Sequence, residues 1–84
     1  MKKIALVQMR EKQKGKIIEV QSGTSLQNRL LSLGVYPGRE ITKLSQFVLR
    51  GPVAIKVGRT VLALGYGMAS KIIIGAFLNF VIIS

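Results

Sequence analysis

The sequence predicts a small, mostly β domain in which about five short strands form a strongly bent barrel, with one short helix after the first strand. Three observations predict this fold: short β-branched segments bounded by glycine-containing turns, one apolar stripe at helical spacing, and a tight two-residue hairpin. A chain of 84 residues is long enough for one domain with a modest core. Its hydrophobic content of 49% against 19% charged residues excludes a disordered chain.

The first predicted strand covers residues 15–20, and the predicted helix begins near Thr24. Thr24 and Gln27 have the spacing of a capping box, in which each side chain pairs with the backbone N–H of the other residue. The helix carries an apolar stripe at i, i+4 and i+7, formed by Leu26, Leu30 and Leu33. We expect this stripe to face the barrel.

Glycines mark the predicted end of the helix and the turn that follows it. Gly34 fits the position just past a helix end, where the left-handed conformation disfavours a Cβ. Pro37 and Gly38 fit the two central positions of a type II turn, because the second of these requires a positive φ. The turn leads into a second predicted strand over residues 40–44, whose imperfect alternation predicts a bulge.

The remaining strands form a hairpin and a closing segment. Residues 53–57 alternate with period two, and Gly58-Arg59 then fits a two-residue type II′ turn with glycine at its first central position. Residues 61–64 return along that strand, a Gly-Tyr-Gly break follows, and residues 71–75 begin the last strand. These elements suit a barrel of the SH3-like kind. We expect its core to contain Ile17, Val20, Leu26, Leu30, Leu33, Ile41, Val53, Ile55, Val57, Leu62, Leu64, Ile72 and Ile74.

Several motifs, taken in their order and spacing, resemble one known family. The segment 29–38, RLLSLGVYPG, resembles the signature of the FeoA family, small cytoplasmic proteins associated with bacterial and archaeal ferrous iron transport. The segments GPVAIKV (51–57), VLAL (61–64) and MASKI (68–72) are similar to the strands and closing segment that follow in that family. The resemblance covers about residues 4 to 75.

The resemblance implies a non-enzymatic, cytoplasmic accessory protein of ferrous iron transport. The implied partner is the membrane iron permease FeoB, whose cytoplasmic side carries a GTPase domain. Docking on that cytoplasmic region would support or regulate Fe(II) uptake and would give peripheral membrane association through the partner. We expect Arg29, Val35, Tyr36 and Arg39 to contribute to the docking surface. The alternative is that Arg29 is a solvated helix residue and Val35 a core residue.

The charge of the chain is strongly positive. Thirteen Lys and Arg residues face three Glu residues, which gives a formal charge of +10. Six bases lie in the first sixteen residues and attract polyanions, whereas bases spread singly through the strands, such as Lys43, are typical of a solvated surface. A basic SH3-like nucleic-acid-binding module is therefore the alternative function. The few aromatic residues do not interleave with the bases as a stacking platform requires, so we expect nucleic acid to bind only non-specifically.

The residue types present argue against catalysis and against a strong metal site. The chain has no His, Cys or Asp, and its three Glu residues are scattered. No base–nucleophile pair and no nucleotide-binding glycine loop is recognisable, so we expect no enzyme, no catalytic residue, no cofactor and no metal ligand set. The FeoA family is also similar to the carboxy-terminal domains of iron- and manganese-dependent repressors. No winged-helix or metal-binding domain accompanies it here, so a stand-alone repressor is not expected.

Each end of the chain carries an apolar segment, and the two segments predict different things. The apolar run before Gln8 is too short for a signal peptide, which favours a cytoplasmic location. We expect a domain over residues 1–75 and an apolar extension over 76–84, which is too short to span a membrane. The extension could continue the last strand into the barrel, anchor at a membrane interface, or pair subunits. We favour a homo-oligomer formed through Phe77, Phe80 and Ile82.

Overall fold

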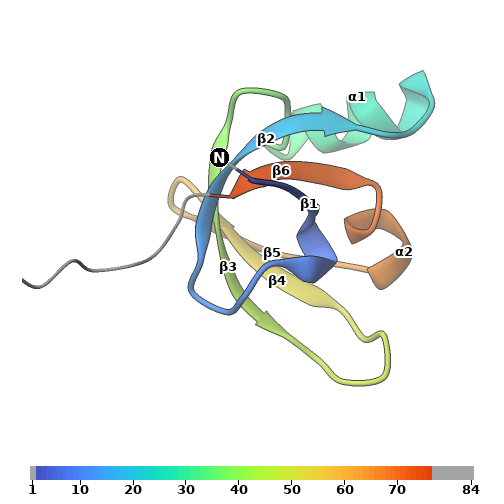
Figure 1. Ribbon diagram of the computed structural model, residues 1–84. Coiled ribbons are helices and arrows are strands. Elements are labelled where there is room, and N and C mark those ends of the chain that lie inside the picture. Colours follow the sequence, from blue (N-terminus) through green and yellow to red (C-terminus); the bar gives the residue numbers. More distant parts are fainter. Residues whose placement is uncertain (1, 77–84) are drawn as a thin grey trace, which may run out of the picture.

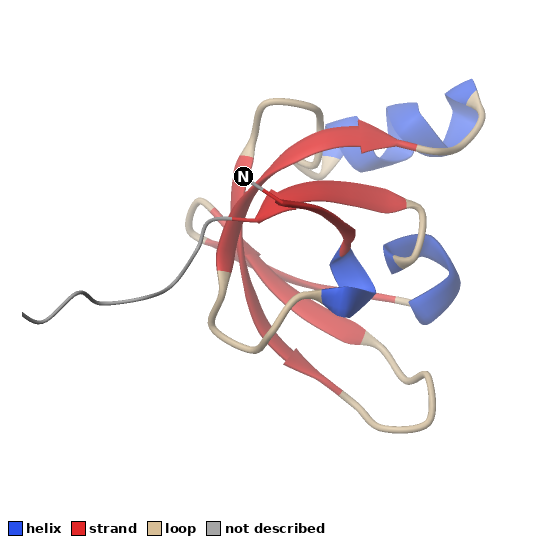
Figure 2. Ribbon diagram, viewed as in Figure 1, coloured by secondary structure: helices blue, strands red, loops and turns tan. Residues whose placement is uncertain are grey.

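The computed structural model describes residues 2–76. Its elements follow in chain order as β1 (Lys2–Ala5), the short 3-10 helix η1 (Leu6–Gln8), β2 (Lys14–Val20), α1 (Thr24–Ser32), β3 (Glu40–Gln46), β4 (Val53–Val57), β5 (Thr60–Leu64), α2 (Tyr66–Ala69) and β6 (Ile72–Ala76) (Figure 1). Figure 2 shows that strands dominate and that the helices are short segments between them. The prediction of a mostly β fold is confirmed.

The six strands form one antiparallel, strongly bent sheet in the order β1-β6-β2-β3-β4-β5 (Figure 1). β1 and β5 are its edges within the described residues, so the sheet is open there. The predicted count of about five strands is wrong because β1 was not foreseen. Despite its two lysines, β1 pairs with β6 from Lys2 opposite Ala76 to Ala5 opposite Ile73. The helix consequently follows the second strand rather than the first.

Helix α1 begins at Thr24 as predicted, but its predicted capping box is not formed. Gly23 occupies the N-cap position, and no side chain caps the helix there. The amide of Gln27 instead donates hydrogen bonds from Nε2 to the carbonyl oxygens of Val20 at 3.2 Å and Ser22 at 2.7 Å. The start of α1 is therefore fastened to the end of β2.

The predicted turn chemistry is confirmed where it depends on local backbone geometry. Gly34 follows α1 with φ 88°, and the N–H of Val35 donates to the carbonyl oxygen of Leu30 at 2.9 Å, as in a Schellman motif. Gly58 has φ 60° in a two-residue turn between β4 and β5. β3 contains the predicted bulge, which lies between Lys43 and Ser45. The strand extends to Gln46, two residues beyond its predicted end.

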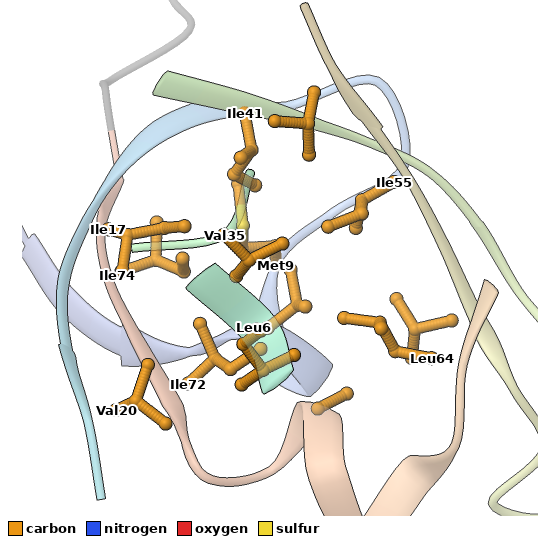
Figure 3. Close-up of a cluster of buried hydrophobic side chains, with 14 residues drawn as sticks. Leu6, Met9, Ile17, Val20, Val35, Ile41, Ile55, Leu64, Ile72 and Ile74 are labelled. Carbon is orange, nitrogen blue, oxygen red and sulfur yellow. The ribbon is translucent and has the colours of Figure 1, made fainter. Parts of the chain in front are cut away.

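The core lies on the inner side of the bent sheet and includes buried residues from every strand except β1 (Figure 3). Most predicted core residues are buried, and Leu26 and Leu62 are partly buried against them. Leu33 is the exception, with 44% of its surface exposed, because it is the C-cap of α1 and the chain then turns so that Val35 enters the core. The core residues that sequence patterning missed are Leu6, Met9, Val35, Ala69 and Ala76.

None of the helices within residues 2–76 is long and apolar enough to cross a membrane. The tail residues proposed for self-association, Phe77, Phe80 and Ile82, lie outside the described residues. Ala76 is the last residue of β6 and is buried. The predicted division of the chain at residue 75 therefore stays a prediction.

Candidate docking surface

The turn that follows α1 is held firmly against β2. Ile17 makes two backbone hydrogen bonds to it: its N–H donates to the carbonyl oxygen of Arg39 at 2.8 Å, and its carbonyl oxygen accepts from Gly38 at 2.7 Å. The N–H of Arg39 also donates to the carbonyl oxygen of Tyr36 at 3.1 Å, which closes the turn. Gly38 has φ 94°, the sign that the predicted type II turn requires at this position. The backbone of this turn is thus fixed before any partner binds.

Within this turn, the structure brings together two of the predicted docking residues. Nη1 of Arg39 donates a hydrogen bond to the hydroxyl of Tyr36 at 3.1 Å, and its guanidinium carbon lies 5.7 Å from the centre of the Tyr36 ring. Nη2 of Arg39 lies so close to Gly58 that a Cβ there would approach it to 2.6 Å. Arg39 therefore bridges the turn after α1 and the turn between β4 and β5, and both side chains stay partly exposed.

A pocket of about 690 Å³ opens beside this pair. It is lined by Lys14, Tyr36, Gly38, Arg39, Glu40, Ile41, Thr42, Leu44, Lys56 and Gly58. Its lining contains three basic side chains and one acidic side chain, so the pocket favours an anionic group. A guanidinium can pair with a carboxylate through two parallel hydrogen bonds, which gives such a contact defined geometry. The arrangement suits an acidic side chain of a partner protein.

The other two predicted docking residues have different positions. Val35 is a core residue with 1% of its surface exposed, so it supports the turn from inside and offers no side chain to a partner. The expectation that Val35 lies on the docking surface is therefore corrected, because the structure places it in the core, as the alternative stated. Arg29 is exposed in the last turn of α1, where a positive charge interacts favourably with the helix dipole. Arg39 contacts Tyr36 and lies beside Gly58.

Sequence reasoning missed the role of Lys43, which it placed among the solvated bases. Lys43 is 2% exposed, and its Nζ donates to the side-chain oxygen of Gln46 and to three backbone carbonyl oxygens: Leu6 at 3.2 Å, Val7 at 3.2 Å and Met9 at 2.7 Å. Burial lowers the pKa of Lys43, and the charge of Glu11 partly offsets this shift. The ammonium group fastens η1 to β3. The available signal was period two, since Lys43 lies two residues after buried Ile41 on the same strand face.

Within residues 2–76, no three His, Cys, Asp or Glu side chains lie together as a metal-binding group. Every buried side-chain nitrogen and oxygen of the described residues has a hydrogen-bond partner. What the structure places together on the surface is the Tyr36–Arg39 pair and the basic pocket beside it.

Comparison with known proteins gives a consistent picture. A family model described as the FeoA domain matches residues 4–75. The chain is similar to a crystal structure described as an iron uptake regulatory protein (FeoA), with 27% identity, a TM-score of 0.82, and coverage of 92% of this chain and 100% of that one. It is also similar to a FeoA-like protein from Clostridium acetobutylicum, with 22% identity, a TM-score of 0.81, and coverage of 95% and 93%. A search of curated proteins found no match.

A second group of similar structures consists of longer regulators. The chain matches a manganese-dependent transcriptional repressor with 14% identity and a TM-score of 0.80. The match covers 89% of this chain but 42% of the repressor. At this identity the likeness shows a shared fold and nothing about shared activity.

Proposed function

This chain belongs to the FeoA family, and on that premise we propose that it is a non-enzymatic accessory protein of ferrous iron transport. The observation that carries the proposal is the family match over residues 4–75. The proposed mode of action is docking on the cytoplasmic region of the iron permease FeoB, which supports or regulates Fe(II) uptake. The bent sheet is then the SH3-like scaffold of that docking module, acting in the cytoplasm and at the membrane through its partner.

The Tyr36–Arg39 pair is the proposed centre of the docking surface. Tyrosine and arginine are among the residue types that most often dominate interface energetics. Here both are ordered in advance, since the turn is bonded to β2 and the guanidinium is bonded to the tyrosine hydroxyl. A preorganised surface loses less conformational entropy on binding. The basic pocket beside the pair gives it a preference for an acidic partner surface.

Uptake of labelled ferrous iron in cells that lack this chain tests the proposed role. Complementation with the wild-type chain restores uptake, whereas complementation with Tyr36→Ala/Arg39→Glu does not. Arg59→Glu is the charge control, because it makes the same change at an exposed residue of the turn between β4 and β5, and it restores uptake. Equal uptake with and without the chain would refute a role in iron transport.

The +10 charge favours nucleic acid as the second candidate partner. Contacts of lysine and arginine with phosphates alone give binding that ignores sequence and weakens steeply with salt. Mobility-shift titrations of duplex DNA and of RNA at increasing salt measure this property directly. A sequence-specific complex that survives physiological salt would favour the nucleic-acid function over docking on the permease.

The apolar extension over residues 76–84, here called the tail, is proposed to pair subunits through Phe77, Phe80 and Ile82. Sedimentation of the full chain and of the Phe77→Ser/Phe80→Ser/Ile82→Ser variant compares their masses in solution. An oligomer that dissociates in the variant supports pairing through the tail. Monomers in both samples would refute it.

A further inference from the structure

The loop between β3 and β4 exposes a run of apolar side chains. Phe47, Val48 and Leu49 are exposed over 67%, 83% and 95% of their surface. A single exposed apolar residue is ordinary in a folded protein, whereas three in succession at the end of a hairpin form one patch. We call residues 47–49 the apolar tip. The Tyr36–Arg39 surface does not include it.

The backbone of this loop keeps the apolar tip extended into solvent. The N–H of Phe47 donates to the carbonyl oxygen of Pro52 at 3.2 Å, which closes the loop. Gly51 packs so tightly that a Cβ there would approach the Cβ of Phe47 to 2.6 Å. Leu49 and Arg50 both have positive φ, 59° and 60°, a conformation that costs energy for residues other than glycine. Such strain at an exposed position points to a functional requirement.

The charged side chains that the structure places in this loop and along the strand leading to it include two bases, Arg50 and Lys12. Arg50 lies in the same loop, with its guanidinium carbon 5.8 Å from the centre of the Tyr66 ring at the start of α2. Lys12, an exposed base of the loop between η1 and β2, donates its backbone N–H to the carbonyl oxygen of Lys43 in the middle of β3 at 2.6 Å, and Glu11 precedes it in the same loop. No acidic residue follows Glu40 in the chain. The loop that carries the tip therefore contains one base and no acidic residue, on a chain whose formal charge is +10.

We propose that the apolar tip inserts into the interface of an anionic lipid membrane. Apolar side chains at the end of a hairpin can enter the boundary between headgroups and acyl chains, while bases behind them contact lipid phosphates. Charge complementarity selects an anionic lipid surface as the occupant. This binding needs no permease, so it goes beyond docking on FeoB and is tested without that partner.

The chain contains no tryptophan, so a single introduced tryptophan reports on one position. Phe47→Trp places the probe in the apolar tip, and Leu31→Trp places a matched probe on α1, where the native side chain is 55% exposed. Both full-length variants are titrated with vesicles of phosphatidylcholine alone and with phosphatidylserine added. We expect blue-shifted emission and quenching by brominated lipid for Phe47→Trp in the anionic vesicles only. Leu31→Trp keeps its aqueous emission.

A second pair of variants measures the strength of binding. Val48→Ser/Leu49→Ser lowers the partition into anionic vesicles at least about tenfold, because two apolar side chains no longer leave water. Leu31→Ser/Leu33→Ser removes two exposed apolar side chains from the region of α1 and leaves the partition unchanged. Aqueous emission of Phe47→Trp in anionic vesicles would overturn the proposal. So would equal partition of wild type and tip variant, or a blue shift that occurs only on addition of the permease's cytoplasmic region.

Discussion

Two loops of this molecule have similar composition and opposite architecture. The turn over residues 36–39 contains an aromatic residue, a proline, a glycine and an arginine, and so does the loop over residues 47–52. In the first loop, the arginine and the aromatic ring contact each other and the turn is bonded to β2. In the second loop, the arginine contacts Tyr66 instead, and the aromatic residue is exposed with its apolar neighbours.

The difference shows how the position of glycine decides where a loop is strained. In the first loop the positive φ falls on Gly38, where it has little cost. In the second loop Gly51 does not take the positive φ, which falls on Leu49 and Arg50. The first loop is therefore a relaxed and ordered surface, suited to a protein partner. The second loop keeps costly geometry at an apolar tip, suited to insertion.

The largest effect on the free energy of unfolding is expected at Lys43, which lies in β3, the strand that leads to the second loop. Lys43→Met removes the ammonium that donates to three backbone carbonyl oxygens, and those of Val7 and Met9 lose this partner, while that of Leu6 keeps its hydrogen bond from the N–H of Met9. We expect the free energy of unfolding to fall by about 3 kcal/mol in urea denaturation. Lys56→Met, an exposed lysine of β4, is the control and changes it by less than about 0.5 kcal/mol. Equal stability of both variants would contradict the anchoring role.

A smaller effect is expected at the relaxed glycine of the first loop. Gly38→Ala adds a Cβ in open space but at φ 94°, so we expect a loss of about 1 kcal/mol from backbone strain alone. Gly67→Ala is the matched control, because it lies in α2 with open space for a Cβ and is not among the positive-φ glycines. Alanine there stabilises slightly. A Gly38→Ala melting temperature equal to that of wild type would show that the turn is not fixed as described.

The smallest effect, with the opposite sign, is expected at the second loop. Leu49→Gly relieves a positive φ at an exposed side chain, so we expect the free energy of unfolding to rise by up to about 1 kcal/mol. Val48→Gly, at a neighbouring residue outside the positive-φ set, is the control and lowers stability through the entropy of the unfolded chain. If Leu49→Gly lowered the free energy of unfolding, the positive φ of Leu49 would not be a source of strain, and the two loops would not differ in this respect.

Sequence patterns predicted what depends on local geometry. Gly34, Gly38 and Gly58 have the positive φ values expected of them, since each is required by its own turn. Sequence patterns failed where the position of a side chain depends on packing between segments that are distant in the chain. Whether Leu33 or Val35 enters the core depends on how the chain leaves α1, which helical spacing alone does not determine.

Long-range pairing explains the other misses. β1 has a basic start and becomes a strand because the edge of β6 accepts it. Burial of Lys43 requires the carbonyl oxygens of η1, which lie more than thirty residues earlier in the chain. In the candidate site, the sequence predicted a docking surface at the turn that contains Tyr36 and Arg39, and this role stays a prediction. Tyr36 and Arg39 pair within one turn, whereas the pocket beside them also needs Gly58 of the turn between β4 and β5, which no local pattern reveals.

Capture of the purified cytoplasmic region of FeoB tests the central claim most directly. The wild-type chain is compared with Tyr36→Ala/Arg39→Glu and with Tyr66→Ala/Arg50→Glu, which makes the same substitutions in the other tyrosine–arginine pair. We expect the wild type and the second variant to capture the region equally, and the first variant to bind it at least about tenfold more weakly. Equal capture by all three proteins would contradict docking through the Tyr36–Arg39 surface, and no capture by the wild type would contradict docking itself.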